Sequence, residues 1–152
     1  MYDARQIANW FIARAMQDQK PVTIMKLLKL VYVSHGWYLE MVGAPLIRNR
    51  IEAWKYGPVI PDVYSVFSGS GASPIGNVLP GYDSTGLDDF TQKFLEQIYN
   101  LYGNKSAIEL SNMTHETGGP WDIASRRNGY FAPIDNETIV QHYRLKRQAA
   151  TG

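Results

Sequence analysis

The chain has 152 residues, of which 45% are hydrophobic and 19% charged, a composition typical of a folded protein. Its length predicts a single domain with its own core. The 15 Lys and Arg residues nearly balance the 14 Asp and Glu residues, so a net charge of +1 supplies no long-range field to attract nucleic acid or anionic lipid. The absence of cysteine excludes disulfides and thiolate metal sites.

The chain opens without a charged and apolar leader. Its longest apolar stretch, residues 27–33, is interrupted by Lys29 and is far shorter than the ~20 residues of a transmembrane helix. We therefore expect a cytoplasmic protein with no membrane contact.

The hydrophobic pattern predicts a helical protein. Asp3 can cap a first helix that runs to about Gln17, because its apolar residues recur every three or four positions. Later capping residues, prolines and apolar stripes predict further helices over residues 61–67, 87–102, 106–113, 120–127 and from 135 or 136 to 145.

The second helix gives the strongest signal in the chain. Thr23 can cap it, an apolar stripe continues to Val42, and Gly43 can end it. Three charged residues fall off that stripe and are expected to face solvent: Lys26, Lys29 and Glu40.

Two segments between the helices have a different character. Residues 44–61 contain several prolines and residues that favour extended backbone, which predicts a loop with a short β-hairpin. Residues 68–86 carry many turn residues and predict a long, mobile surface loop. The predicted fold is mainly α with a small β-hairpin, a compact single-domain helical bundle over residues 1–145, followed by a frayed basic tail at 146–152.

A metal or hydrolytic site would have to draw on His35, His115, Glu116 and His142. None of these histidines lies four residues from another, as helical zinc motifs require, and His115 and Glu116 are adjacent. We expect His35 to be a hydrogen-bonded core residue and His115 to bond backbone groups at a turn. The sequence predicts no cofactor, and a small hydrolase stays an alternative of another class.

Nucleic-acid binding is a further alternative. Five basic residues could line one edge of the last helix, but cations also favour a helix C-terminus on dipole grounds alone. They are Arg126, Arg127, Arg144, Lys146 and Arg147. We consider a nucleic-acid partner the weaker interpretation.

The segment Trp54-Lys55-Tyr56-Gly57-Pro58 combines two large rings and a lysine with a rigid turn. Each ring can pack the loop onto the helices or face a partner, and interface anchors are drawn mainly from Trp, Tyr and Arg. We therefore predict a protein-binding surface at Trp54, Lys55, Tyr56 and Tyr64.

Three segments together resemble the antitoxin SocA-like Panacea domain family, which is also called phage-associated GepA-like. The resemblance covers about residues 7–127. It rests on Lys26-Leu27-Leu28-Lys29-Leu30-Val31-Tyr32 with His35-Gly36-Trp37-Tyr38-Leu39, on Ile51-Glu52-Ala53-Trp54-Lys55-Tyr56-Gly57-Pro58-Val59-Ile60-Pro61 with Val63 and Tyr64, and on Leu110-Ser111, Thr114-His115 and Pro120-Trp121.

The resemblance implies a bacterial or phage-encoded protein that neutralises a toxin by direct binding, the toxin being encoded by an adjacent gene. It brings no catalytic residues. One branch of the family implies an alternative, an adaptor that delivers its toxin to the unfoldase of an ATP-dependent protease. The shared motif is expected to be scaffold, with these positions structural: His35, Trp37, Gly57, Pro58, His115, Pro120 and Trp121.

Overall fold

In the computed structural model, which describes residues 1–151, helices dominate and a small antiparallel sheet lies at one end. The predicted fold class, mainly α with a small β-hairpin, is confirmed. No helix in this part of the chain is long and apolar enough to cross a membrane. The elements are α1 (Ala4–Gln17), α2 (Ile24–Val42), β1 (Glu52–Trp54), β2 (Gly57–Val59), α3 (Pro61–Phe67), η1 (Ser68–Ser70), η2 (Ser84–Gly86), α4 (Asp89–Tyr102), α5 (Ala107–Thr114), α6 (Pro120–Asn128), β3 (Ala132–Pro133) and α7 (Asn136–Thr151).

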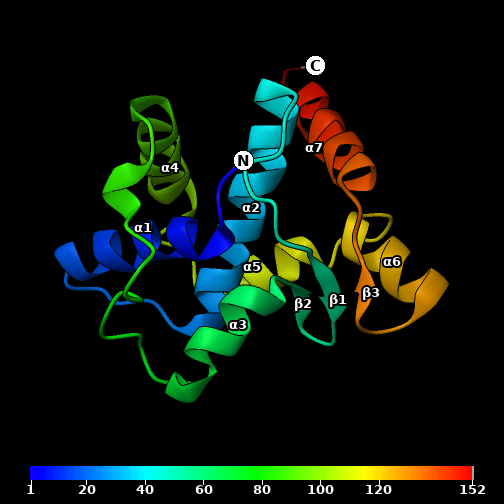
Figure 1. Cartoon of the computed structure of the whole chain (residues 1–152). Helices are drawn as coiled ribbons and strands as arrows, with labels where there is room; N and C mark the ends of the chain where they lie inside the picture. Colours follow the sequence, from blue (N-terminus) through cyan, green and yellow to red (C-terminus); the bar gives the residue numbers. More distant parts are fainter. Residues whose placement is uncertain (152) are drawn as a thin grey trace.

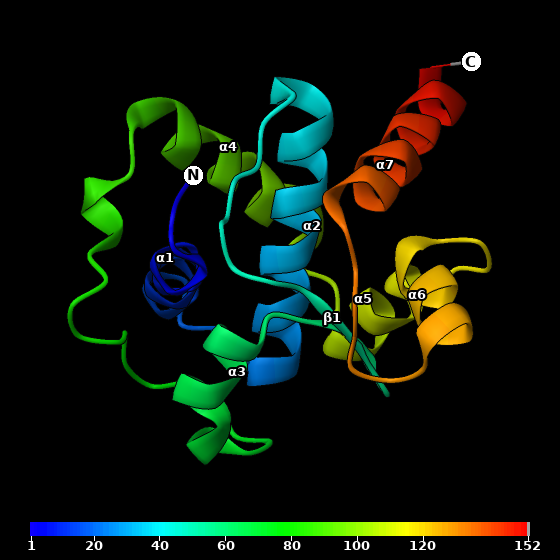
Figure 2. The same ribbon diagram turned by 45° about the vertical axis from the view of Figure 1, so that its right-hand side comes forward.

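Helix α2 is the centre of the fold, with α1 and α4 on one side and α6 and α7 on the other (Figure 1 and Figure 2). Thr23 caps its first turn by accepting a hydrogen bond from the N–H of Lys26 at 3.4 Å. Gly43 ends the helix with a φ of 78°, in the left-handed region that glycine tolerates best. The predicted start and end of this helix are therefore confirmed.

The prediction that Lys29 faces solvent is wrong. Every residue from 27 to 36 is buried, and Lys29 itself is 1% exposed. The reason is that α5, α7 and β2 cover the face of α2 that the amphipathic pattern assigned to water. The expectation also fails for Lys26, which is half-buried, and for Glu40, whose side chain is 6% exposed. They bond to the carbonyl of Gly103 and to the guanidinium of Arg147.

The hairpin lies against α2 and widens into a three-stranded sheet in the order β2-β1-β3. In the hairpin Ala53 pairs with Pro58, and on its other edge Glu52 pairs with Pro133 of β3. The hairpin was predicted, whereas β3 was not. A strand of two residues is too short to show the period-two alternation by which strands are predicted.

The loop between α3 and α4 lies on the surface, as predicted, but it is fastened to the helices. Ile75 is buried, and its N–H donates to the carbonyl of Val22 at 2.8 Å. The side chain of Asn9 exchanges two hydrogen bonds with the backbone of Leu79 and donates a third to the carbonyl of Tyr82, all at 2.8 Å. One buried amide on α1 therefore fixes the path of the loop.

The predicted frayed tail is wrong for residues 146–151, because α7 continues as a helix to Thr151. Two basic side chains fasten this last part to the rest of the fold. Lys146 donates to Glu116 at 2.7 Å, and Arg147 pairs with Glu40 of α2 at 2.5 Å. Gly152 lies outside the described residues.

Candidate protein-binding surface

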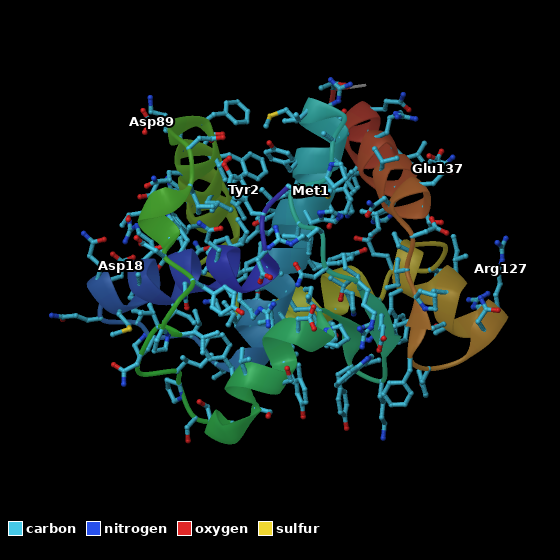
Figure 3. All side chains as sticks on the ribbon, viewed as in Figure 1. Met1, Tyr2, Asp18, Asp89, Arg127 and Glu137 are labelled. Atoms are coloured by element: carbon cyan, nitrogen blue, oxygen red, sulfur yellow. The ribbon has the colours of Figure 1, made fainter. Side chains whose placement is uncertain are left out.

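The structure brings the predicted contact residues of the hairpin and α3 onto one surface. The rings of Trp54 and Tyr64 meet edge to face with centroids 4.9 Å apart. The ammonium of Lys55 lies 5.5 Å from the centre of the Tyr56 ring, within the range of a cation–π contact. Figure 3 shows side chains projecting outward at the end of the molecule formed by the hairpin and α3.

These residues line a mainly apolar groove with a volume of about 340 Å³. That size falls at the lower end of the ~300–1,000 Å³ range of ligand pockets, and it suits a few inserted side chains. We call it the aromatic groove, and it is lined by Ile24, Met25, Leu28, Lys29, Trp54, Lys55, Tyr56, Val59, Tyr64 and Phe131.

Exposure separates the rings that pack from the rings that face solvent. Tyr56 is 61% exposed and Tyr64 38% exposed. Trp54 is half-buried, and its indole N–H donates to Glu52 at 2.9 Å. Trp54 therefore forms the base of the surface, and the two tyrosines stand at its edge.

Phe131 belongs to the same surface, although the sequence did not predict it. Its ring is 64% exposed and stacks edge to face on Trp54 at 5.4 Å. Its φ is 69°, a left-handed conformation that is uncommon for a bulky residue and costs on the order of 1–2 kcal/mol. A hydrogen bond of 2.7 Å from its N–H to the carbonyl of Ala53 holds it there. The one sequence signal was two adjacent aromatic residues after Gly129, between two helices.

Gly57 and Lys29 fix the turn below the exposed rings. Gly57 has a φ of 122°, and an added Cβ would lie 2.8 Å from Cε of Lys29 and 3.1 Å from Oγ1 of Thr114. The ammonium of Lys29 donates to the carbonyl of Pro58 at 3.1 Å. Burial alone lowers the pKa of Lys29 to about 8. The hairpin tip is therefore in contact with the buried ammonium of Lys29, and only glycine fits at position 57.

The shift in the pKa of Lys29 predicts an alkaline rise in stability. Between pH 8 and 10.5, the ordinary pKa of lysine, the unfolded chain binds more protons than the folded chain, so the free energy of unfolding rises with pH. Burial raises the pKa values of Tyr32 and Tyr143 above 10, so the unfolded tyrosines ionise first and stability falls above about pH 10. We expect a gain of about 2 kcal/mol between pH 8 and pH 10.

Urea unfolding at half-unit pH steps measures this rise. Lys29→Met should remove most of it, because the substitution removes the group whose pKa differs most between the two states in this range. A free energy of unfolding that stays level or falls from pH 8 to pH 10 in the unmodified chain would contradict the assignment.

The third segment of the family motif, residues 110–121, is hydrogen-bonded to the backbone of the hairpin. The indole N–H of Trp121 donates to the carbonyl of Trp54 at 2.6 Å, and the hydroxyl of Ser111 donates to the carbonyl of Tyr56 at 2.8 Å. His115 stacks on Trp121 with ring centres 4.1 Å apart, and its Nδ1 lies 2.6 Å from the carbonyl of Ser111. Pro120 occupies the first turn of α6, from which Trp121 projects. Segments far apart in the sequence therefore meet at the hairpin backbone.

His35 and Trp37 lie outside the aromatic groove. Their side chains connect α2 to neighbouring elements by hydrogen bonds and ring contacts. Nδ1 of His35 accepts from the N–H of Ile47 at 3.4 Å, so Nε2 donates to Oδ1 of Asn136 at 2.8 Å. Burial lowers the pKa of His35. Trp37 donates to the hydroxyl of Tyr102 at 2.8 Å and stacks edge to face on Tyr143. Both residues occupy packing positions between α2 and its neighbours.

The residues considered for metal or hydrolytic chemistry are not assembled for it. Nδ1 of His115 faces the carbonyl of Ser111, while Glu116 faces His142 at 3.6 Å and Lys146 at 2.7 Å. Residues 1–151 contain no group of three or more His, Cys, Asp or Glu side chains placed to hold a metal ion. The adjacent His115 and Glu116 therefore contact different groups, a backbone carbonyl and two side chains of α7.

The basic residues considered for nucleic-acid binding are partly engaged with acids. Arg126 pairs with Asp122 at 2.9 Å, and Lys146 and Arg147 pair with the carboxylates of Glu116 and Glu40. Arg127 lies at the outer end of α6, away from α7 (Figure 3). Three of the five basic side chains are thus already paired with carboxylates, and Arg127 stands apart from those of α7.

The fold and the groove define a mainly helical protein whose exposed aromatic residues are held by a buried scaffold. The sequence model described as "Antitoxin SocA-like, Panacea domain" matches residues 27–122. The chain is also 35% identical over 136 residues to Antitoxin SocA of Caulobacter vibrioides (strain NA1000 / CB15N), covering 84% of this chain and 72% of that protein. No solved structure matches the chain.

The chain therefore belongs to the antitoxin SocA-like Panacea domain family, as its motifs had indicated. The matched residues contain the second and third motif segments and nearly all of the first. Phe131 lies beyond them, so the groove combines residues inside and outside the matched part. Membership implies a cognate toxin as partner.

Proposed function

We propose that this protein neutralises its cognate toxin by binding it directly, with the aromatic groove at the centre of the interface. The observation that carries the proposal is the set of exposed rings, Tyr56, Tyr64 and Phe131, on a base formed by Trp54. Large rings held in fixed positions lose little conformational entropy on binding, and such residues dominate the energetics of protein interfaces.

The backbone of Phe131 supports the same proposal. A left-handed φ at a bulky residue is unfavourable, and such strain concentrates at binding and catalytic positions. Here it keeps an aromatic ring in solvent beside the groove. An interface of standard size would bury about 800 Å² on this protein, which is more than the groove alone provides. The hairpin, α3 and the 129–134 segment would form the surrounding rim.

The second candidate function is a proteolytic adaptor, which needs a separate surface for the unfoldase. One observation favours it, a second mainly apolar groove of about 420 Å³ between α2, α4 and α7. It is lined by Trp37, Glu40, Met41, Phe94, Gln97, Ile98, Leu101, Tyr102 and Arg147. The two grooves share no lining residue, so an adaptor could bind two partners at once.

Co-expression with the toxin of the adjacent gene separates the two candidates. Direct neutralisation predicts that cells grow, that the toxin stays at full level, and that both proteins are recovered as a complex in cells lacking ATP-dependent proteases. An adaptor predicts instead that the toxin disappears and that protection requires a protease. Protection without any recoverable complex in protease-deficient cells would refute direct neutralisation.

A further inference from the structure

The aromatic groove carries charge of one sign only. Two of its lining residues are charged, and both are lysines: Lys29 below the floor and Lys55 in the exposed turn of the hairpin. Neither belongs to any ion pair within residues 1–151. The charged residues that line the groove are therefore both cationic. The carboxylate of Glu52, which accepts from the Trp54 indole, is paired with Arg50, so the two lysines set a positive potential in the groove.

Lys29 is the stronger source of this potential. An ammonium has three donor hydrogens, and the carbonyl of Pro58 accepts one of them at 3.1 Å. A buried ion is usually balanced by a carboxylate, and none pairs with Lys29 in the part of the chain that the structure describes. Low-dielectric surroundings and the absence of nearby counterions leave its field poorly screened. With a pKa lowered only to about 8, the group is still mostly charged at neutral pH.

We infer that the partner segment entering the aromatic groove carries an Asp or Glu side chain beside a large apolar side chain, with the carboxylate attracted to Lys29 and Lys55. This inference rests on the proposed function and specifies the chemistry of the toxin's contact segment. The apolar side chain packs against the rings of Trp54 and Phe131, and the carboxylate supplies the counter-charge that the fold omits. A basic segment of the same shape is repelled, so the lysines also select the partner.

Binding of the purified toxin from the adjacent gene to three forms of this protein tests the inference: unmodified, Lys29→Met and Lys55→Met. At 0.1 M salt we expect Lys29→Met to weaken the affinity about 10-fold and Lys55→Met about 3-fold. At 0.5 M salt the effect of the exposed Lys55 should nearly vanish, while that of the buried Lys29 persists. Lys29→Met should not lower the melting temperature, because removal of the buried charge offsets the loss of the hydrogen bond to Pro58.

A double-mutant cycle then identifies the acid on the toxin. Each Asp or Glu of the toxin is changed to Asn or Gln, and one such change should weaken binding to the unmodified protein but not to Lys29→Met. If Lys29→Met does not fold, the same cycle with Lys55→Met at 0.1 M salt takes its place. Unchanged affinity in both lysine variants, or no coupled acid, overturns the inference and leaves direct binding intact. A toxin that does not bind the unmodified protein refutes the proposed function as well.

Discussion

Replacing Gly36 by alanine is expected to lower the free energy of unfolding by about 3 kcal/mol, at the top of the range for overpacked cores. Gly36 lies on α2 where α7 crosses it, and the added Cβ would lie 2.6 Å from two atoms of the Tyr143 ring. That ring is buried and also contacts Tyr32 and Trp37, so a shift away from the added Cβ would disturb both contacts. Denaturant unfolding of Gly36→Ala measures the loss.

Gly69→Ala is the matched control, because no atom outside its chain neighbours lies within 4 Å of the Cβ that it would add. We expect this variant to unfold within about 0.5 kcal/mol of the unmodified protein. A Gly36→Ala variant that is as stable as the control would show that α7 does not pack on α2 as described.

Phe131→Ala is expected to weaken toxin binding by about 30-fold, the effect of truncating an aromatic hot spot worth about 2 kcal/mol. The ring is 64% exposed, so its removal loses few stabilising contacts of the fold other than the edge-to-face contact with Trp54. We therefore expect the free energy of unfolding to fall by no more than about 1 kcal/mol. Calorimetric titration with the toxin, together with thermal unfolding, measures the two effects separately.

Tyr130 provides the control for this prediction. It precedes Phe131 directly and is 56% exposed, but it does not line the aromatic groove. Tyr130→Ala should change the affinity for the toxin by less than about 3-fold. Equal losses of affinity in the two variants would place the contact elsewhere on the 129–134 segment. Unchanged affinity in both variants would show that Phe131 does not contact the toxin.

Local rules predicted the elements whose determinants are close together in the sequence. The cap at Thr23, the apolar stripe and Gly43 define α2 without reference to any other part of the chain. Ser106 and Glu109 likewise form the reciprocal cap that opens α5. The turn chemistry at Gly57 and Pro58 indicated the hairpin, and its rings indicated a candidate surface.

The features that the sequence did not predict depend on distant contacts. Lys29 is buried because other elements surround α2, and the period of a single helix cannot show how many neighbours it has. Phe131 joins the groove through pairing with Ala53, a residue 78 positions earlier in the chain. The helical end of α7 is likewise fastened by Glu40 and Glu116, which lie on other parts of the chain.

Hydrogen–deuterium exchange on the complex with the toxin tests the central claim most directly. If the aromatic groove is the binding surface, added toxin should slow amide exchange in residues 52–64 and 129–134. The second groove, at residues 37–41 and 94–102, should exchange as in the free protein. Slowed exchange confined to the second groove, with residues 52–64 unchanged, would contradict the account.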